Sequence, residues 1–269
     1  MKWIRFEHNG APRFGVLKDG VVTATALAWH DVLAGRTPDP GPELRLEDVS
    51  LLAPVPRPGK VIAIGLNYMD HCRETNTPPP SRPIIFTKFP TAIIGQGAPI
   101  TWPGALTREV DYEAELAVVI GRTARHVSEA EALGFVFGYT AANDVSARDL
   151  QFSDGQWVRA KSLDTFCPLG PALVTTDEIP DPQALTIRCE LNGQIVQDSH
   201  TREMIFNVAH LIAFCSQAFT LEPGDVILTG TPHGTGAFRT PKLFMQHGDR
   251  VAVEIERIGR LENPCVVEP

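Results

Sequence analysis

The chain has 269 residues, of which 43% are hydrophobic and 21% are charged. These fractions are typical of a folded globular protein and exclude wholesale disorder, and the length allows one large domain or a large domain with a small one. The 32 acidic and 24 basic residues give a formal net charge of −8 without any Lys/Arg cluster, which argues against nucleic acid or an anionic membrane as partner.

The five cysteines are scattered and contain no Cys-x-x-Cys pair, so neither a zinc ribbon nor a disulfide framework is indicated. The first residues carry no apolar signal core, and no uncharged apolar run reaches the ~18–20 residues that span a bilayer. We therefore expect a reduced, cytoplasmic protein without a membrane partner.

The N-terminal part, residues 1–53, is rich in strand-forming segments, and Lys18-Asp-Gly20 supplies a hairpin turn. The strands are expected at residues 3–6, 13–17 and 21–25. Residues 54–59 are rich in proline and read as a linker. The expected organisation is a small N-terminal β domain over residues 1–53 and a second domain over residues 58–269.

The second domain alternates short apolar runs with turn residues, which is typical of strands separated by tight connections. Strands are expected at residues 61–64, 84–88, 92–94, 113–120, 169–175, 185–191, 194–198, 226–229 and 251–255. A capping box at Ser128 and Glu131 predicts a helix over 128–137, and apolar residues at three-to-four spacing predict another over 204–219. The fold class is therefore α+β and dominated by strands.

Several common chemistries lose support because their motifs are missing from the sequence. There is no G-x-G-x-x-G, no Walker A lysine loop, no H-E-x-x-H and no G-x-S-x-G. The glycine-rich run of residues 230–236 follows a strand without a clear helix behind it, so it fits a turn as well as a phosphate cradle.

Two carboxylates stand at the start of the most apolar strand. Glu113 and Glu115 are two residues apart, so in a strand both point to one face, and the run over 116–120 takes that strand into the interior. Two buried carboxylates repel each other and need a cation, and hard oxygen ligands suit Mg²⁺, Mn²⁺ or Ca²⁺ rather than zinc. The alternative is a sheet edge at which both glutamates meet water.

A third carboxylate, Asp144, lies where a strand-like segment turns helical. Arg148 and Gln151 follow four and seven residues later, on the same face of that turn if it is helical. Asp144 could complete a metal site. Alternatively, Asp144 caps the helix and Arg148 pairs with a surface acid.

Two further groups could carry chemistry. His71 and Glu74 are neighbours on a helical turn, so Glu74 could orient the imidazole as a general base, although such pairs are often surface contacts. Lys161, just before an apolar strand, is either a surface residue or a cationic partner for an anionic ligand. The polar, proline-rich residues 67–82 read as a surface segment, with a lid as one interpretation.

Six motifs in unbroken order resemble the fumarylacetoacetate hydrolase family in its short form, which has a small N-terminal region and one catalytic domain. The resemblance covers about residues 58–260. The motifs are Gly65-Leu-Asn-Tyr-Met-Asp-His71, Pro83-Ile-Ile-Phe-Thr-Lys88, Asp111-Tyr-Glu-Ala-Glu-Leu-Ala-Val-Val-Ile-Gly121, Gly138-Tyr-Thr-Ala-Ala-Asn-Asp-Val-Ser-Ala-Arg-Asp-Leu-Gln151, Lys161-Ser-Leu-Asp-Thr-Phe166 and Leu221-Glu-Pro-Gly-Asp-Val-Ile-Leu-Thr-Gly-Thr-Pro232.

The resemblance implies a β-sandwich-like roll, a homodimer, and one Mg²⁺ or Mn²⁺ per chain. The implied metal ligands are Glu113, Glu115 and Asp144. The implied catalytic residues are His71, Glu74 and Lys161, the first two as a dyad on a closing lid, and the implied substrate-binding residues are Arg148, Gln151, Lys161 and Thr231.

The implied activity is chemistry on a small 2-oxo mono- or dicarboxylic acid through an enolate that the metal stabilises. Lys161 and Arg148 would hold the substrate carboxylate, and His71 would activate water or move a proton at C3. Hydrolysis of a C–C bond in an acylpyruvate is the expected reaction. The alternatives are 2-hydroxyhepta-2,4-diene-1,7-dioate isomerisation, oxaloacetate decarboxylation, or a non-catalytic protein that binds an oxo acid.

Overall fold

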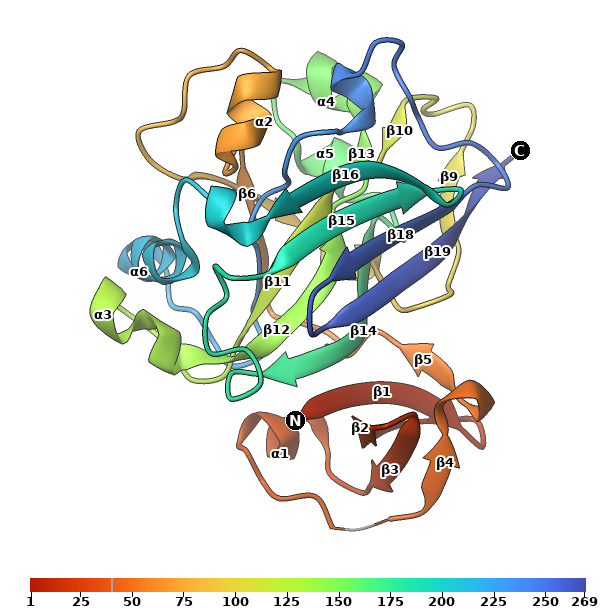
Figure 1. Ribbon diagram of the computed structural model, residues 1–269, viewed down its shortest axis with the longest axis vertical. Coiled ribbons are helices and arrows are strands. Elements are labelled where there is room, and N and C mark those ends of the chain that lie inside the picture. The colour runs from red at the N-terminus through yellow and green to blue at the C-terminus, as the bar shows by residue number, and fades with distance from the viewer. Residues whose placement is uncertain (40) are drawn as a thin grey trace.

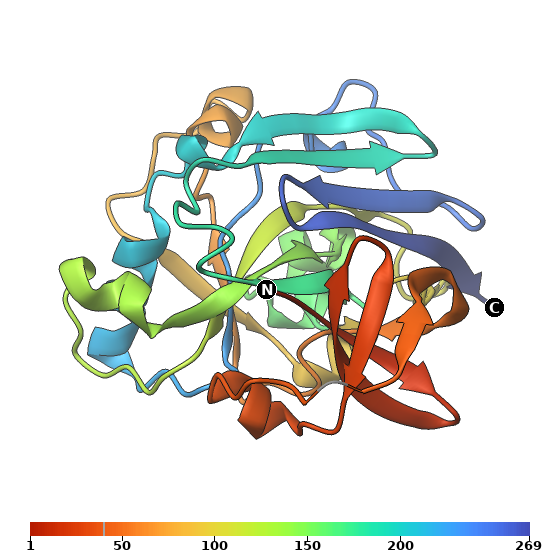
Figure 2. The same ribbon diagram turned by 60° about the horizontal axis from the view of Figure 1, so that its bottom comes forward.

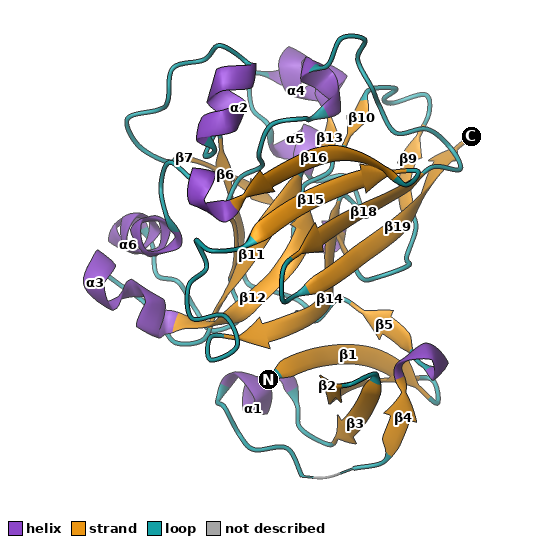
Figure 3. Ribbon diagram, viewed as in Figure 1, coloured by secondary structure: helices purple, strands orange, loops and turns teal. Residues whose placement is uncertain are grey.

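The structure, a computed structural model, describes residues 1–39 and 41–269 and is built mainly from strands, with short helices around them (Figures 1 and 3). The strands are β1 (Lys2–His8), β2 (Ala11–Lys18), β3 (Val21–Thr25), β4 (Glu43–Arg45), β5 (Ser50–Leu52), β6 (Val61–Gly65), β7 (Ile84–Lys88), β8 (Ile93–Ile94), β9 (Ile100–Pro103), β10 (Val110–Asp111), β11 (Ala114–Ile120), β12 (Val136–Asn143), β13 (Ser146–Ala147), β14 (Cys167–Thr175), β15 (Thr186–Leu191), β16 (Gln194–His200), β17 (Val226–Leu228), β18 (Arg250–Ile255) and β19 (Gly259–Glu268). The α-helices are α1 (Trp29–Leu33), α2 (Met69–Glu74), α3 (Glu129–Ala132), α4 (Arg148–Asp154), α5 (Val158–Lys161) and α6 (Val208–Ala218).

Two sheets form the body of the molecule. The first has the strand order β4-β3-β2-β1-β14-β12-β11-β17-β6-β7, with β5 paired to β1 and β8 to β14. The second has the order β16-β15-β18-β19-β9, and β10 pairs separately with β13. The strand-dominated α+β class predicted from the sequence is therefore correct, and the chain has the mixed-sheet architecture of the expected roll.

The central strand β11 is buried along its whole length, because both of its faces are covered. Leu116 and Val118 belong to the core that β15, β18 and α6 also share. Ala117 and Val119 face the other side and pack in a second core with residues of β6 and β17. This two-sided burial explains why the segment reads as a continuous apolar run rather than an alternating one.

The N-terminal unit, residues 1–53, contains β1 to β5 and α1, so its strand-rich character is as predicted (Figure 2). It continues the first sheet, because β1 pairs with β14 through Lys2–Val174 and Trp3–Leu173. The helices α2, α4 and α5 lie at the opposite end of the molecule (Figure 1). Whether residues 1–53 and 58–269 behave as separate domains stays a prediction.

Helix ends differ from the predictions for local reasons. The capping box of Ser128 and Glu131 is present, but α3 ends at Ala132 and gives way to a 3₁₀ turn before β12. Helix α6 begins only at Val208, because the Asn207 side chain accepts a hydrogen bond from the His210 N–H and caps it.

Two strands of the second sheet were not predicted. In β19 one of the alternating buried positions is the polar Asn263 and the next residue is a proline, which hides the apolar pattern, and β9 is only four residues long. A type II turn precedes β17, since Gly224 has φ of +90° and the Asp225 N–H donates to the Glu222 carbonyl. None of the helices in the described part of the chain is long and apolar enough to cross a membrane.

Candidate active site

The three carboxylates predicted as metal ligands meet at one end of β11 and β12. Glu113 immediately precedes β11 and Asp144 immediately follows β12, and these strands pair through Ala114 and Asn143. One carboxylate oxygen from each of Glu113, Glu115 and Asp144 lies within 4.8 Å of the others. Glu113 is 6% exposed and Glu115 is 1% exposed, so the alternative of a solvated sheet edge is wrong.

Two buried lysines hold Asp144 from both sides. Lys161 Nζ lies 2.8 Å from Asp144 Oδ2 and 2.7 Å from Glu113 Oε2, and Lys88 Nζ lies 2.5 Å from Asp144 Oδ1. Helix α4 is capped by Ala147, so the alternative that Asp144 caps it is wrong. Burial acts to lower the pKa of Lys161, but the Asp144 and Glu113 charges outweigh it and raise this pKa. Lys161 is therefore a buried cation and not a surface residue.

Arg148 is the third buried cation of the cluster. Its guanidinium contacts Asp111 Oδ2 at 2.8 Å and Glu113 Oε1 at 2.6 Å, and its NH1 donates to Gln151 Oε1 at 2.8 Å. The predicted shared face of Arg148 and Gln151 is correct, whereas the alternative surface partner for Arg148 is not. Burial acts to raise the pKa of Glu113, but Lys161 and Arg148 outweigh it and lower this pKa to about 2.

Glu115 is the carboxylate of this cluster that forms no ion pair with Lys88, Lys161 or Arg148. The cluster contains four carboxylates and three cations, and among the described residues no cation forms an ion pair with Glu115. Within the described part of the chain, its Oε2 accepts a hydrogen bond from the backbone N–H of Gly230 alone, at 2.7 Å. Burial raises the pKa of Glu115 strongly, and the neighbouring Asp144 and Glu113 charges raise it further. The cluster thus carries one uncompensated buried negative charge when Glu115 is ionised.

This donor set fits a divalent cation. Each ionised carboxylate offers about four lone-pair positions, so the two lysines on Asp144 do not use up its capacity. Three converging carboxylate oxygens suit a hard cation such as Mg²⁺ or Mn²⁺. Glu113, Glu115 and Asp144 are therefore the residues that could hold it.

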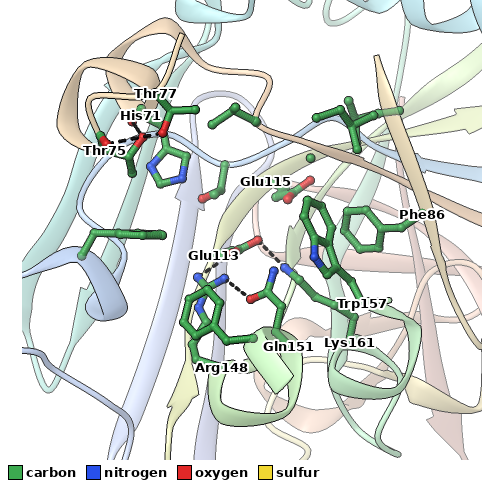
Figure 4. A pocket seen from close by; sticks show the side chains of 17 residues that line it. His71, Thr75, Thr77, Phe86, Glu113, Glu115, Arg148, Gln151, Trp157 and Lys161 are labelled. Atoms are coloured by element: carbon green, nitrogen blue, oxygen red, sulfur yellow. Dashed lines mark hydrogen bonds and ion pairs between the residues drawn. The ribbon is translucent and has the colours of Figure 1, made fainter. Parts of the chain in front are cut away.

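A cavity of about 410 Å³ opens above this cluster (Figure 4). His71, Thr75 and Thr77 lie on one side of it and Phe86 and Trp157 on the other, with Glu113, Lys161 and Arg148 between them. The lining consists of Ile64, Gly65, Leu66, His71, Thr75, Thr77, Ile84, Phe86, Glu113, Glu115, Arg148, Gln151, Phe152, Trp157, Lys161, Thr231 and Phe238.

The cavity brings together most of the site residues expected from the sequence. Seven of them line it directly: His71, Glu113, Glu115, Arg148, Gln151, Lys161 and Thr231. The other two, Glu74 and Asp144, contact lining residues from behind.

The His71–Glu74 pair lies at the cavity and not on the open surface. His71 is buried on α2, and its Nδ1 donates to Glu74 Oε2 at 3.0 Å. The other Glu74 oxygen accepts the Gly234 N–H at 2.9 Å. Burial acts to raise the pKa of Glu74, but the hydrogen bond from His71 and then that from Gly234 outweigh it and lower this pKa. Because Nδ1 carries the proton, Nε2 of the neutral imidazole is the free base.

Three contributors to the site were missed at the level of sequence. Lys88 ends one of the six motifs, and its place at the close of an apolar strand is the signal that could have indicated its buried ion pair with Asp144. Trp157 and Phe86 form an aromatic wall with ring centroids 5.3 Å apart. Trp157 also lies so close to Gly65 that a Cβ there would come within 2.5 Å of the indole ring.

Comparisons with known proteins show which proteins this chain resembles. The family model "Fumarylacetoacetate (FAA) hydrolase C-terminal" matches residues 60–266, and the model "Rv2993c-like, N-terminal" matches residues 1–54. Among curated relatives, "Oxaloacetate tautomerase fahd2, mitochondrial" of Xenopus laevis is 52% identical over 225 residues, 83% of this chain and 70% of the relative. The human "Oxaloacetate tautomerase FAHD2A, mitochondrial" is 50% identical over 227 residues, 84% of this chain and 72% of the relative.

Solved structures extend the likeness over the whole chain. A fumarylacetoacetate hydrolase from Exiguobacterium antarcticum is 40% identical, with a TM-score of 0.92 and 100% of both chains covered. A 2-hydroxyhepta-2,4-diene-1,7-dioate isomerase from Mycobacterium marinum is also 40% identical, with a TM-score of 0.86 and 100% of this chain and 99% of that one covered.

Proposed function

The chain belongs to the fumarylacetoacetate hydrolase family, and we propose that it is a divalent-cation-dependent tautomerase that interconverts the keto and enol forms of a short 2-oxo dicarboxylic acid such as oxaloacetate. The observation that carries the proposal is the uncompensated buried carboxylate of Glu115 beside three buried cations at the cavity floor. The choice of tautomerisation is supported by the names of relatives that share half of their residues with this chain.

The charge count of the floor supports a 2-oxo acid as the ligand. Four carboxylates against three cations leave one negative charge, and a dication would turn this into one positive charge, the complement of a substrate carboxylate. When bound, the cation supplies Lewis-acid stabilisation of the negative charge that develops on a substrate oxygen.

The chain's own groups have donors to spare for such a ligand. Lys161 uses two of its three protons on Glu113 and Asp144, so the third can point to the substrate. The Gln151 oxygen accepts from Arg148, so its amide N–H groups can donate into the cavity. Together these donors would hold the carboxylate and the adjacent oxygen of a 2-oxo acid.

His71 supplies the base that a keto–enol exchange needs. Its Nε2 would take the proton from C3 and give it to the C2 oxygen of the enolate, and Glu74 would stabilise the imidazolium that forms in between. Phe238 packs edge-on against the imidazole, with ring centroids 5.4 Å apart, and limits its orientations. A second base is not required, since the same nitrogen can pass the proton in both directions.

The test is the exchange of the C3 hydrogens of oxaloacetate for deuterium, followed by NMR with Mg²⁺ present and after chelation. We expect metal-dependent exchange well above the spontaneous rate, without accumulation of pyruvate. Pyruvate formed as fast as the exchange would make the protein a decarboxylase. A failure to accelerate any reaction of any 2-oxo acid would overturn the proposal.

Hydrolysis of an acylpyruvate is the second candidate, because the same His71–Glu74 pair could activate water and the Exiguobacterium antarcticum structure bears the name of a hydrolase. An acylpyruvate cleaved faster than oxaloacetate is enolised would favour it. Turnover of 2-hydroxyhepta-2,4-diene-1,7-dioate would favour isomerisation, as in the Mycobacterium marinum protein's name.

Three further proposals concern the setting of the enzyme. We propose Mg²⁺ or Mn²⁺ as the cofactor, which metal analysis of protein purified without chelator tests. We propose a homodimer in the cytoplasm. The mass of the protein in solution tests the homodimer, and fractionation of cells that express the chain tests the cytoplasmic location.

A further inference from the structure

Gln197 joins the second sheet to the active site. It lies on β16, the edge strand of that sheet, and is 1% exposed. Its Oε1 accepts the backbone N–H of Ala114 at 2.9 Å, and Ala114 stands between Glu113 and Glu115. Since a backbone N–H can only donate, this contact identifies which end of the amide is oxygen. Its Nε2 must then face the loop of residues 231–233.

The nitrogen end of Gln197 meets only acceptors. Nε2 lies 3.0 Å from Thr231 Oγ1, 2.9 Å from the Pro232 carbonyl and 3.3 Å from the His233 carbonyl. An amide nitrogen cannot accept, so Thr231 Oγ1 accepts from Gln197. Among the described residues no group accepts the hydroxyl proton of Thr231, and Thr231 lines the cavity.

The same loop is held to β16 at a second point. A Cβ at Gly234 would come within 2.2 Å of the Val196 carbonyl, so the loop backbone lies directly against the strand. The Gly234 N–H in turn donates to Glu74. β16 therefore fixes both the Thr231 hydroxyl and the backbone donor that orients the His71–Glu74 pair.

We infer that Gln197 is a positioning residue: by donating to Thr231 Oγ1, it commits the Thr231 hydroxyl proton to an anionic oxygen of the substrate. This rests on the proposed function in one respect, that the cavity binds a 2-oxo acid. Without the amide donor, the lone pair of the Thr231 hydroxyl is no longer held toward β16, so its proton can turn away from the ligand. Loss of a hydrogen bond to a charged group should weaken affinity by roughly 10-fold or more.

The test is a double-mutant cycle of Gln197→Met and Thr231→Val, read by calorimetric binding of pyruvate with Mg²⁺ and by kcat and KM. Each single variant should weaken pyruvate binding about 10-fold and raise KM more than it lowers kcat. The double variant should be no weaker than Thr231→Val alone, because Gln197 acts through the Thr231 hydroxyl. Thr231→Ser, which keeps the hydroxyl, should bind pyruvate like the wild type.

A second variant guards against misfolding. Gln197→Glu keeps an oxygen that accepts the Ala114 N–H, but its carboxylate makes the Thr231 hydroxyl donate to residue 197 instead of to the ligand. The effect of this substitution on pyruvate binding should therefore be smaller in the Thr231→Val background. Gln183→Leu is the matched control. Gln183 accepts from the Val208 N–H and donates to the Thr201 carbonyl away from the cavity, so its loss should lower thermal stability and leave pyruvate binding unchanged.

If Gln197→Met weakens pyruvate binding equally in the wild-type and the Thr231→Val backgrounds, the inference is overturned and the proposed function stays intact. A wild-type protein that binds no 2-oxo acid would instead overturn the proposed function, and this inference with it.

Discussion

The floor and the rim of the cavity are built in different ways. The floor consists of Glu113, Glu115, Asp144, Lys161 and Arg148, which stand at the ends of central strands or on helices packed against them and are all buried. The rim is α2 with the residues up to 77, a six-residue helix on the chain's surface.

Polar contacts attach the rim to the body, in addition to the buried side chains of His71 and Cys72. Arg73 pairs with Glu203 at 2.7 Å, Asp70 accepts from the Ser199 hydroxyl at 2.5 Å, and Glu74 accepts from the Gly234 N–H. Under the proposed function, the floor would bind the charged head that all 2-oxo acids share, and the rim would supply the base that acts on the rest of the molecule. This division explains how relatives with one fold bear the names of tautomerases, isomerases and hydrolases.

The largest effect should come from the floor. Glu115→Gln should lower kcat/KM by roughly 10³-fold or more and abolish tight Mn²⁺ binding, because the amide removes the carboxylate of the cluster that forms no ion pair with Lys88, Lys161 or Arg148. For the same reason the metal-free variant should unfold at no lower temperature than the wild type. The control Glu254→Gln, at an exposed position of β18, should change neither. Wild-type Mn²⁺ affinity in Glu115→Gln would show that the floor is not the metal site.

Lys161→Met should lower kcat/KM by about 10²–10³-fold, the usual effect of removing one donor from developing negative charge. It also leaves Glu113 and Asp144 with one cation fewer, so bound Mg²⁺ should be retained. Steady-state kinetics and metal analysis check both. Arg159→Met, an exposed basic residue on the same helix, is the control. Activity that survives Lys161→Met and falls with Arg159→Met would reverse the assignment.

The His71→Ala variant should separate the contribution of the rim to catalysis from that of the floor. Loss of the base should lower kcat about 10²-fold while KM and metal affinity stay near the wild type. His210→Ala removes a similar pair, 2.8 Å from Glu129 on the far helices, and should leave kcat unchanged. An unaltered kcat in His71→Ala would remove the rim from the chemistry and would favour decarboxylation at the floor alone.

The smallest effect concerns stability and pH. The pKa of Glu74 is lowered in the folded protein although burial opposes this, so the unfolded chain binds the proton first as the pH falls. The stabilisation is therefore complete above the ordinary pKa of glutamate and is lost as the pH falls through the lowered one. Urea unfolding should give a difference of about 0.5–1 kcal/mol between the wild type and Glu74→Gln at pH 7, vanishing in acid. A difference that grows in acid would contradict the hydrogen bond with His71.

The contrast between floor and rim also shows what sequence alone can reveal. The shared position of Glu113 and Glu115 could be predicted, because side chains two residues apart on a strand point to the same face of the sheet. The cation that pairs with each carboxylate could not be predicted. Lys88 and Asp144, for example, are 56 residues apart in the sequence and meet only because the sheet brings β7 and β12 together.

The remaining differences have similar causes. The role of Gln197 lies in a contact between two sheets, which no local pattern records. β19 was missed because Asn263 and Pro264 interrupt its apolar pattern, although Asn263 is buried, and β9 was missed because its partner β19 lies at the other end of the second domain. Long-range pairing, rather than propensity, decides such strands.

The central claim is that three buried carboxylates hold one divalent cation, and crystals soaked with Mn²⁺ test it most directly. The anomalous difference map should show one strong peak per chain, about 2.0–2.2 Å from an oxygen of each of Glu113, Glu115 and Asp144. A fully active protein whose crystals show no Mn²⁺ peak between these side chains would contradict the account.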